Sequence, residues 1–133
     1  MTLKIIKGNL FDRTLGENEY YVHCISRDYA CGAGIVKEFN RRYNLTPRLS
    51  AMPRTKAMLV DDVFNLVTKP KYWMKPTYES LKECLLELST KNAKTLVMPK
   101  IGWGLDKLKW DAVKKLIEDV FRDINITIEV YYL

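Results

Sequence analysis

The stretch that decides the fold is Leu96-Val97-Met98-Pro99-Lys100-Ile101-Gly102-Trp103-Gly104-Leu105-Asp106. An apolar, strand-like run ends at Pro99, a Gly-x-Gly loop follows, and a helical pattern begins near Lys109. In an open α/β sheet this order places backbone N–H groups beside a helix start, where they can bind a phosphate. Glycine allows φ > 0 and a close approach of the main chain to the anion. A carboxylate repels an anion, so Asp106 indicates a separate chemical role.

Outward from this stretch, apolar periodicity predicts alternating strands and helices. We predict strands at 3–7, 20–25, 57–60, 63–67, 95–98 and 126–131, and helices at 35–43, 77–88 and 110–121. Residues 47–56 are predicted to be irregular and basic. Thr77 is a good N-cap, and Glu87 and Lys91 are expected to pair on the exposed face of the second helix. The order predicts a single α/β domain over 1–133, with a mixed sheet and helices on its faces.

Composition narrows the class of protein. The chain has 133 residues, of which 47% are hydrophobic and 29% charged, which suits one folded domain. No segment approaches the roughly 20 apolar residues that cross a bilayer, and the N-terminus enters a strand pattern without a signal-peptide core. We therefore expect a cytoplasmic monomer without membrane contact. One histidine and three cysteines without paired spacing favour neither a metal site nor disulfides.

The net charge of +6 and the pI of about 9.2 favour anionic partners. Contact with DNA or RNA is one interpretation. The other is that the charge serves solubility alone, because the lysines and arginines are scattered rather than gathered in a stripe.

Four segments fall at or near the carboxyl ends of predicted strands, where ligands bind in open α/β sheets. They are Asn9, residues 26–34, Lys69 and residues 101–106. The turn Gly32-Ala33-Gly34 opens the first predicted helix. Alone it indicates a tight connection, but together with the second Gly-x-Gly loop it suggests two phosphate-binding loops for a diphosphate.

Lys69 and Asp106 are the candidate catalytic residues. Lys69 directly follows an apolar strand, and a lysine at a half-buried edge can attack a carbonyl or aldehydic carbon. The alternative is an ordinary surface lysine. Asp106 can transfer protons or stabilise an oxocarbenium-like centre; otherwise it caps a helix or pairs with Lys109.

Other residues near these loops support weaker hypotheses. Cys31 at a helix start is an unlikely nucleophile, because its one possible partner, His23, lies on a buried strand. Trp103 is either a lid over a ligand or a hydrophobic anchor. The C-terminal residues Tyr131-Tyr132-Leu133 either stack on a base or belong to the core.

Several motifs together resemble the macrodomains, and specifically the terminal ADP-ribose protein glycohydrolase branch. The matching segments, which span the chain, are Gly8-Asn9-Leu10-Phe11, His23-Cys24-Ile25-Ser26, Gly32-Ala33-Gly34-Ile35, Thr68-Lys69 with Lys75-Pro76-Thr77-Tyr78-Glu79, and 98–106. This resemblance implies a three-layer α/β/α fold with a central mixed sheet and a cleft for ADP-ribose. The ligand-binding residues expected are Asn9, Leu10, Ser26, Gly32, Ala33, Gly34, Ile35, Thr68, Pro99, Ile101, Gly102, Trp103, Gly104, Leu105, Tyr131 and Leu133.

By the same resemblance, Lys69 attacks the anomeric carbon of the distal ribose, and Asp106 assists and resolves the intermediate. Two departures matter. The resemblance implies that Asn9 recognises the adenine amino group, but the branch has an aspartate at this position. The amide oxygen of Asn9 can still accept a hydrogen bond from that amine, without charge assistance. Cys24 to Ser26 replace the catalytic asparagine of other branches, which favours the lysine-dependent mechanism.

The expected reaction releases ADP-ribose from a modified acidic side chain or nucleic-acid base, or deacetylates O-acetyl-ADP-ribose, without metal or cofactor. Two alternatives remain at this stage. One is a non-catalytic reader of ADP-ribose, and the other is a phosphatase acting on ADP-ribose-1″-phosphate.

Overall fold

Six strands form one mixed sheet in the order β1-β6-β5-β2-β4-β3 in the computed structural model, which describes residues 1–133. The strands are β1 (Thr2–Lys7), β2 (Glu19–Ser26), β3 (Ala57–Val60), β4 (Val63–Lys69), β5 (Thr95–Pro99) and β6 (Thr127–Tyr132). All neighbours are parallel except β3, which runs antiparallel to β4. The predicted mixed sheet is confirmed.

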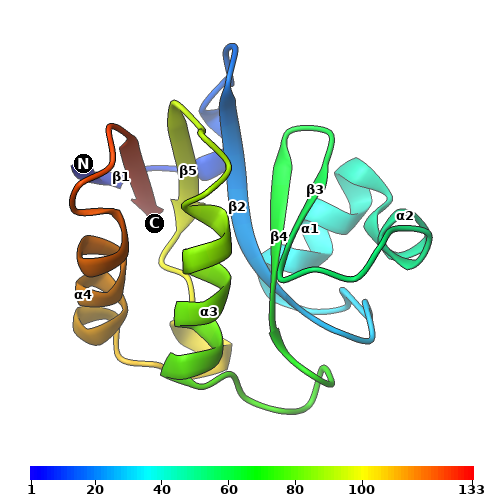
Figure 1. The fold of residues 1–133 in the computed structure, drawn as a ribbon. Coiled ribbons are helices and arrows are strands. Elements are labelled where there is room, and N and C mark those ends of the chain that lie inside the picture. The colour runs from blue at the N-terminus through cyan, green and yellow to red at the C-terminus, as the bar shows by residue number, and fades with distance from the viewer.

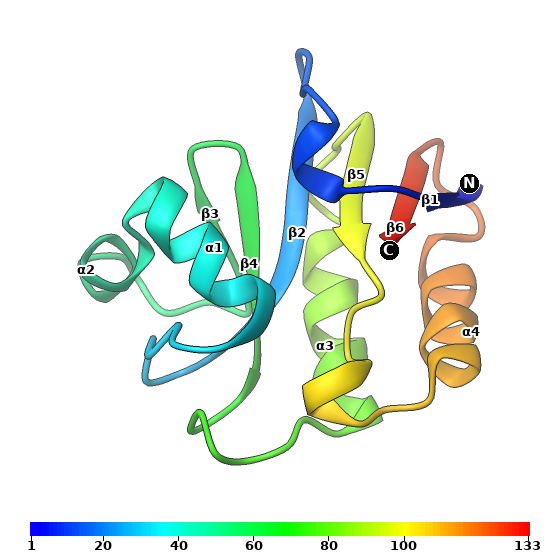
Figure 2. The same ribbon diagram turned by 180° about the vertical axis from the view of Figure 1, so that it is seen from behind.

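Helices cover both faces of the sheet. They are α1 (Gly34–Tyr43), α2 (Leu45–Ser50), α3 (Tyr78–Leu88) and α4 (Trp110–Phe121), with short 3-10 turns η1 (Leu10–Asp12) and η2 (Gly104–Asp106). The helices α3 and α4 lie in front of the sheet in Figure 1, and α1 and α2 lie in front of it when the molecule is turned by 180° (Figure 2). The arrangement is therefore the three-layer α/β/α fold that was expected. None of these helices has the length and apolar character that a membrane span requires.

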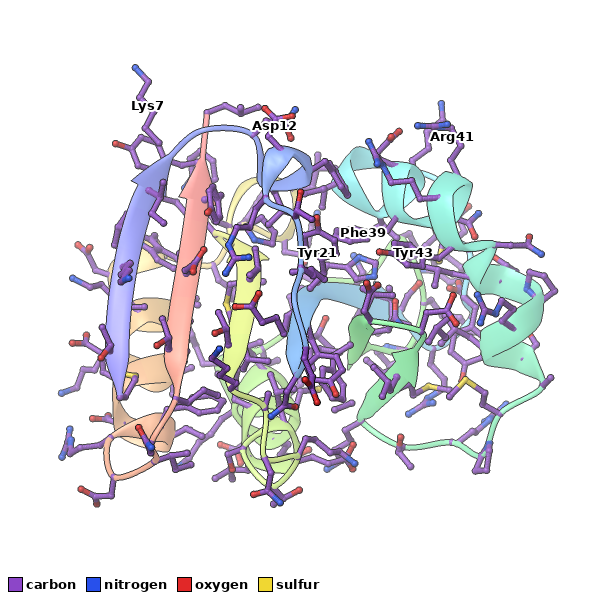
Figure 3. The ribbon with its side chains drawn as sticks, turned by 90° about the horizontal axis from the view of Figure 1, so that it is seen from above. Lys7, Asp12, Tyr21, Phe39, Arg41 and Tyr43 are labelled. Carbon is purple, nitrogen blue, oxygen red and sulfur yellow. The ribbon has the colours of Figure 1, made fainter.

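Each face of the sheet has its own hydrophobic core. On one side α3 and α4 bury Leu81, Leu85, Ile117 and other side chains against the sheet. On the other side an aromatic group gathers around Phe39 of α1, whose ring lies 5.7 Å from that of Tyr21 and 6.3 Å from that of Tyr43 (Figure 3). The two cores fix both layers of helices, and hence the loops that join them to the strands.

The start of α3 confirms the predicted cap. Thr77 accepts a hydrogen bond from the Ser80 backbone N–H, and the Ser80 hydroxyl accepts one from the Thr77 N–H. This capping box satisfies two N–H groups that the helix itself leaves free. The predicted pair of Glu87 with Lys91 is wrong. The Glu87 carboxylate instead accepts a hydrogen bond from the backbone N–H of Ala57, where α3 packs on β3.

The prediction of an irregular segment from residue 47 is also wrong at its start, because α2 runs from Leu45 to Ser50. Pro47 sits in the first turn of α2, where its missing N–H costs no hydrogen bond. Leu45 and Leu49 are fully buried one turn apart. Burial of these two leucines stabilises a helix that the local sequence pattern does not predict.

Candidate active site

A cleft of about 1380 Å³ opens where β2, β4, β5 and β6 end. The segments that wall it are η1, the loop from β2 into α1, the loop after β4, the loop after β5 and the C-terminus. In Figure 2 η1 and the loop into α1 lie on the face of the sheet that carries α1, and the loop after β4 runs below the sheet toward α3. Every residue expected at the site lines this cleft except Thr68 and Gly104. The prediction that the four segments at the strand ends lie together is therefore confirmed.

The two exceptions have physical reasons. Thr68 precedes Lys69 on β4, and successive side chains of a strand point to opposite faces. Its side chain is consequently buried away from the cleft, and its hydroxyl has no hydrogen-bond partner. Gly104 begins η2 with φ +72°, and a Cβ there would meet no atom within 4 Å. It lines a shallower hollow beside the start of α4 instead.

Lys69 and Asp106 both line the cleft and form an ion pair with each other. Lys69 Nζ lies 2.9 Å from Asp106 Oδ1, and the two side chains are only 16% and 17% exposed. Lys69 is the last residue of β4, and its carbonyl accepts a hydrogen bond from the backbone N–H of Arg27. Asp106 is the last residue of η2 and neither caps α4 nor pairs with Lys109. The pair is thus a half-buried cation and carboxylate in contact with the cleft.

The first glycine loop leads into α1. Gly34 begins the helix at φ +60°, and the N-cap residue Ala33 offers no side-chain acceptor to the first N–H groups of α1. Free N–H groups at a helix start favour an anion. A Cβ at Gly34 would lie 3.4 Å from Leu105 Cδ1. The two glycine loops therefore approach each other across the cleft at Leu105.

The second glycine loop depends on Gly102. Its φ is +73°, and a Cβ there would lie 2.9 Å from Leu108 Cδ1 and 3.4 Å from a methyl group of Val113. Only glycine combines this conformation with such close packing. Its backbone N–H also faces Cys24, whose thiol pKa is raised mainly by burial and also by the nearby Asp106. Cys24 is accordingly a neutral thiol beside the catalytic candidates.

Asp28 joins the loops on either side of Lys69, a role that the sequence analysis missed. Its carboxylate accepts hydrogen bonds from the Ser26 hydroxyl and from the backbone N–H groups of Ala30 and Tyr72. Burial opposes ionisation, but these hydrogen bonds outweigh it and lower the pKa of Asp28. On the far side of the cleft Lys75 Nζ donates to the Leu105 carbonyl. The loop after β4 is thereby held to both glycine loops.

Several further residues line the cleft although the sequence analysis did not expect them to bind the ligand. Further lining residues are Gly8, Phe11, His23, Cys24, Ile25, Ala30, Cys31, Val36, Tyr72, Lys75, Lys100 and Tyr132. Most of them belong to motifs or segments quoted above, such as residues 8–11 and 23–26, whereas Val36 and Tyr72 belong to none. Tyr72 and Lys75 lie on a loop whose course depends on tertiary contacts.

The structure also decides among the weaker hypotheses. Burial raises the pKa of the Cys31 thiol, which agrees with the argument against a cysteine nucleophile. Trp103 is 59% exposed and so is not a core anchor, and Lys100 Nζ lies 5.6 Å from its ring centroid. The Tyr131 hydroxyl donates to Glu129, which fixes the Tyr131 ring at the cleft, while Tyr132 is exposed.

Comparison with solved structures places this fold among the macrodomains. The macrodomain of Mycobacterium tuberculosis DarG superposes with a TM-score of 0.83 at 18% identity, covering 99% of this chain and 98% of that one. No protein-family model matches the sequence.

Two curated relatives are closer in sequence. The chain is 38% identical to ADP-ribose glycohydrolase OARD1 of Bos taurus over 138 aligned positions, which cover 96% of this chain and 90% of the relative. It is 37% identical, with the same coverage, to ADP-ribose glycohydrolase OARD1 of Homo sapiens. The chain belongs to the OARD1 family of macrodomains.

Proposed function

We propose that this protein hydrolyses conjugates of ADP-ribose, with Lys69 as nucleophile and Asp106 as its proton acceptor. The contact that carries this proposal is the 2.9 Å approach of Lys69 Nζ to Asp106 Oδ1. The pair lies in a cleft that also holds two glycine loops suited to a diphosphate. The family supports the same conclusion, since its curated relatives carry the name ADP-ribose glycohydrolase.

In the proposed reaction the diphosphate binds between the loops at Gly32–Gly34 and Gly102–Leu105, which directs the distal ribose toward Lys69. Asp106 accepts a proton from Lys69, and the free amine attacks the anomeric carbon. A C–N bond forms while the bond from that carbon to the conjugated oxygen breaks, and the leaving group departs with the electron pair. Water then adds to the anomeric carbon, the amine leaves and regains its proton, and ADP-ribose is released.

The test is release of ADP-ribose from a mono-ADP-ribosylated glutamate substrate by wild type, Lys69→Arg and Asp106→Asn. Arginine retains the positive charge but cannot supply a neutral amine. We expect Lys69→Arg to lower kcat by at least about a hundredfold, which is the scale of losing a catalytic group. An undiminished rate in Lys69→Arg would contradict the nucleophile role.

Two other functions give different results in the same set of variants. A reader binds ADP-ribose, yet its wild type releases no more product than the variants. A phosphatase liberates phosphate from ADP-ribose-1″-phosphate, and does so after Lys69→Arg and in a further variant, Lys69→Ala. Acetate release from O-acetyl-ADP-ribose that is lost with Lys69 would extend the proposed mechanism to a deacetylase reaction.

A nucleic-acid conjugate is a second candidate substrate, favoured by the loop after β4. Tyr72 and Trp73 are 63% and 65% exposed, their rings pack edge to face, and Lys71 and Lys75 flank them. Exposed aromatic rings between lysines suit the bases and phosphates of a single strand. Activity on an ADP-ribosylated protein with none on an ADP-ribosylated oligonucleotide would contradict this candidate.

A further inference from the structure

The short turn η2, which carries Asp106, is held by few contacts of its own side chains. Leu105 is 65% exposed, and the carboxylate of Asp106 has one hydrogen-bond partner, Lys69. The backbone on either side of Asp106 is unusual, because Gly104 and Lys107 have φ of +72° and +60°. A lysine with positive φ is strained and keeps this conformation only where its surroundings hold it. The position of Asp106 therefore depends on contacts made by the backbone of the turn.

Two side chains beside the start of α3 make such contacts, one on each side of Asp106. Lys75 Nζ donates a hydrogen bond to the carbonyl of Leu105, which directly precedes Asp106. The Tyr78 hydroxyl accepts a hydrogen bond of 2.9 Å from the backbone N–H of Lys109, three residues after Asp106. The backbone that carries Asp106 is thus attached at two points to the segment leading from β4 into α3.

These attachments also join the two catalytic candidates. Lys69 and Lys75 lie six positions apart on one segment. The first contacts the Asp106 carboxylate, and the second contacts the carbonyl directly before it. Because the peptide bond between residues 105 and 106 is planar, a fixed carbonyl restrains the backbone from which the Asp106 side chain extends. Tyr78 adds a rigid support, since it is the first residue of α3 and this helix is anchored in the core.

We propose that Lys75 and Tyr78 are positioning residues, which hold Asp106 at hydrogen-bond distance from Lys69 while Asp106 accepts the lysine proton. Neither residue takes part in a chemical step. The inference rests on the proposed function, which gives Asp106 its task. A displacement of about 1 Å lowers a rate by up to about a hundredfold. Loss of one attachment out of two is therefore expected to lower the rate by about tenfold.

Lys75→Met and Tyr78→Phe each remove one attachment with little change of shape. Methionine keeps an unbranched chain but has no N–H to donate, and phenylalanine lacks only the hydroxyl. The conservative variant Lys75→Arg keeps a donor for the Leu105 carbonyl and should restore most of the rate. The matched controls are Lys82→Met, at an exposed position on α3, and Tyr20→Phe on β2, both outside the cleft.

The decisive comparison places each variant in wild type and in Asp106→Asn. A residue that acts through Asp106 loses its effect once the acid is gone. The measurements are the single-turnover rate of ADP-ribose release from mono-ADP-ribosylated glutamate and the Kd for ADP-ribose. We expect Lys75→Met and Tyr78→Phe to lower the rate about tenfold in wild type but less than about twofold in Asp106→Asn. The Kd should stay within about twofold of wild type throughout.

Three results would overturn the inference while the proposed function stands. They are the same loss of rate in both backgrounds, wild-type rates in Lys75→Met and Tyr78→Phe, and a Lys75→Arg variant as slow as Lys75→Met. If wild type releases no ADP-ribose, or if Asp106→Asn is no slower than wild type, the proposed function itself fails and the inference fails with it.

Discussion

The carboxylate of Asp28 accepts a hydrogen bond of 3.0 Å from the backbone N–H of Tyr72, which lies 44 residues further along the chain. The same carboxylate accepts from the hydroxyl of Ser26 and the backbone N–H of Ala30 in the loop before α1. A single side chain thus connects the first glycine loop to the segment that follows Lys69. Both walls of the cleft depend on it for their relative position.

Substitution of Asp28 should weaken ligand binding more than it destabilises the fold. Hydrogen bonds to a charged acceptor are stronger than neutral ones, so Asp28→Ala is expected to raise the dissociation constant for ADP-ribose by about tenfold. Asp28→Asn keeps an oxygen for Ser26 and Ala30 but turns a nitrogen toward Tyr72, and should give a smaller loss. Calorimetry measures the affinity, with Asp123→Ala as an exposed control. Wild-type affinity in Asp28→Ala would contradict this account of the cleft.

The two glycines of the second loop should differ in their tolerance of a Cβ. Gly102 and Gly104 have nearly the same positive φ, so alanine costs each about 1–2 kcal/mol of backbone strain. At Gly102 the new methyl group also crowds Leu108 and Val113, whereas at Gly104 it meets open space. Urea unfolding should show Gly102→Ala losing about 1–3 kcal/mol more than Gly104→Ala. Equal losses would mean that the packing around Gly102 relaxes freely.

His23 should make the fold sensitive to mild acid. Its Nε2 contacts Asn65 Oδ1, its ring stacks on Phe39, and burial lowers its pKa from 6.5 to about 4. Between pH 6.5 and pH 4 the unfolded chain binds a proton at His23 that the folded chain does not. The free energy of unfolding must therefore decrease as the pH falls through this range, by about 3 kcal/mol at pH 4.

The measurement for His23 is urea unfolding from pH 7 to pH 4 in wild type and His23→Gln. The difference between the two slopes isolates the histidine, because the carboxylates titrate in both proteins. Glu19, whose pKa is lowered to about 2 mainly by its hydrogen bond from Arg13, adds a further loss in both below pH 4.5. Parallel pH profiles above pH 4.5 would show that His23 is not held neutral.

Much of the site could be predicted because it follows from strand ends. Lys69 and the loop ending at Asp106 each come directly after an apolar strand, and parallel strands place their carboxyl ends at one edge. The contact between Lys69 and Asp106 could not be predicted, because no local pattern gives the distance between residues 37 positions apart. Thr68 was expected at the site because it belongs to the matching segment Thr68-Lys69, and strand alternation, which no motif reveals, turns its side chain away from the cleft.

Residues that act through long-range contacts could not be predicted. Asp28 has no distinguishing local pattern, and its role depends on where the loop containing Tyr72 lies. The helix α2 was not predicted because its sequence contains Pro47. Its formation is explained by the burial of Leu45 and Leu49, which depends on the tertiary structure. In contrast, the cap of α3 and the amphipathic faces of α3 and α4 are local properties, and both helices lie where their sequences predict them.

The central claim is a covalent bond between Lys69 and the distal ribose, and reductive trapping tests it most directly. Wild type, Lys69→Arg and Asp106→Asn would be incubated with ADP-ribosylated substrate and cyanoborohydride, and their intact masses measured. The glycosylamine at Lys69 is in equilibrium with an imine, which forms when the bond from the anomeric carbon to the ring oxygen breaks and the oxygen takes a proton, and cyanoborohydride reduces this imine to a stable amine. We predict an added mass of one ADP-ribosyl group on wild type, located at Lys69 by peptide mapping, and none on Lys69→Arg. Wild type that turns over substrate without any adduct at Lys69 would contradict the account.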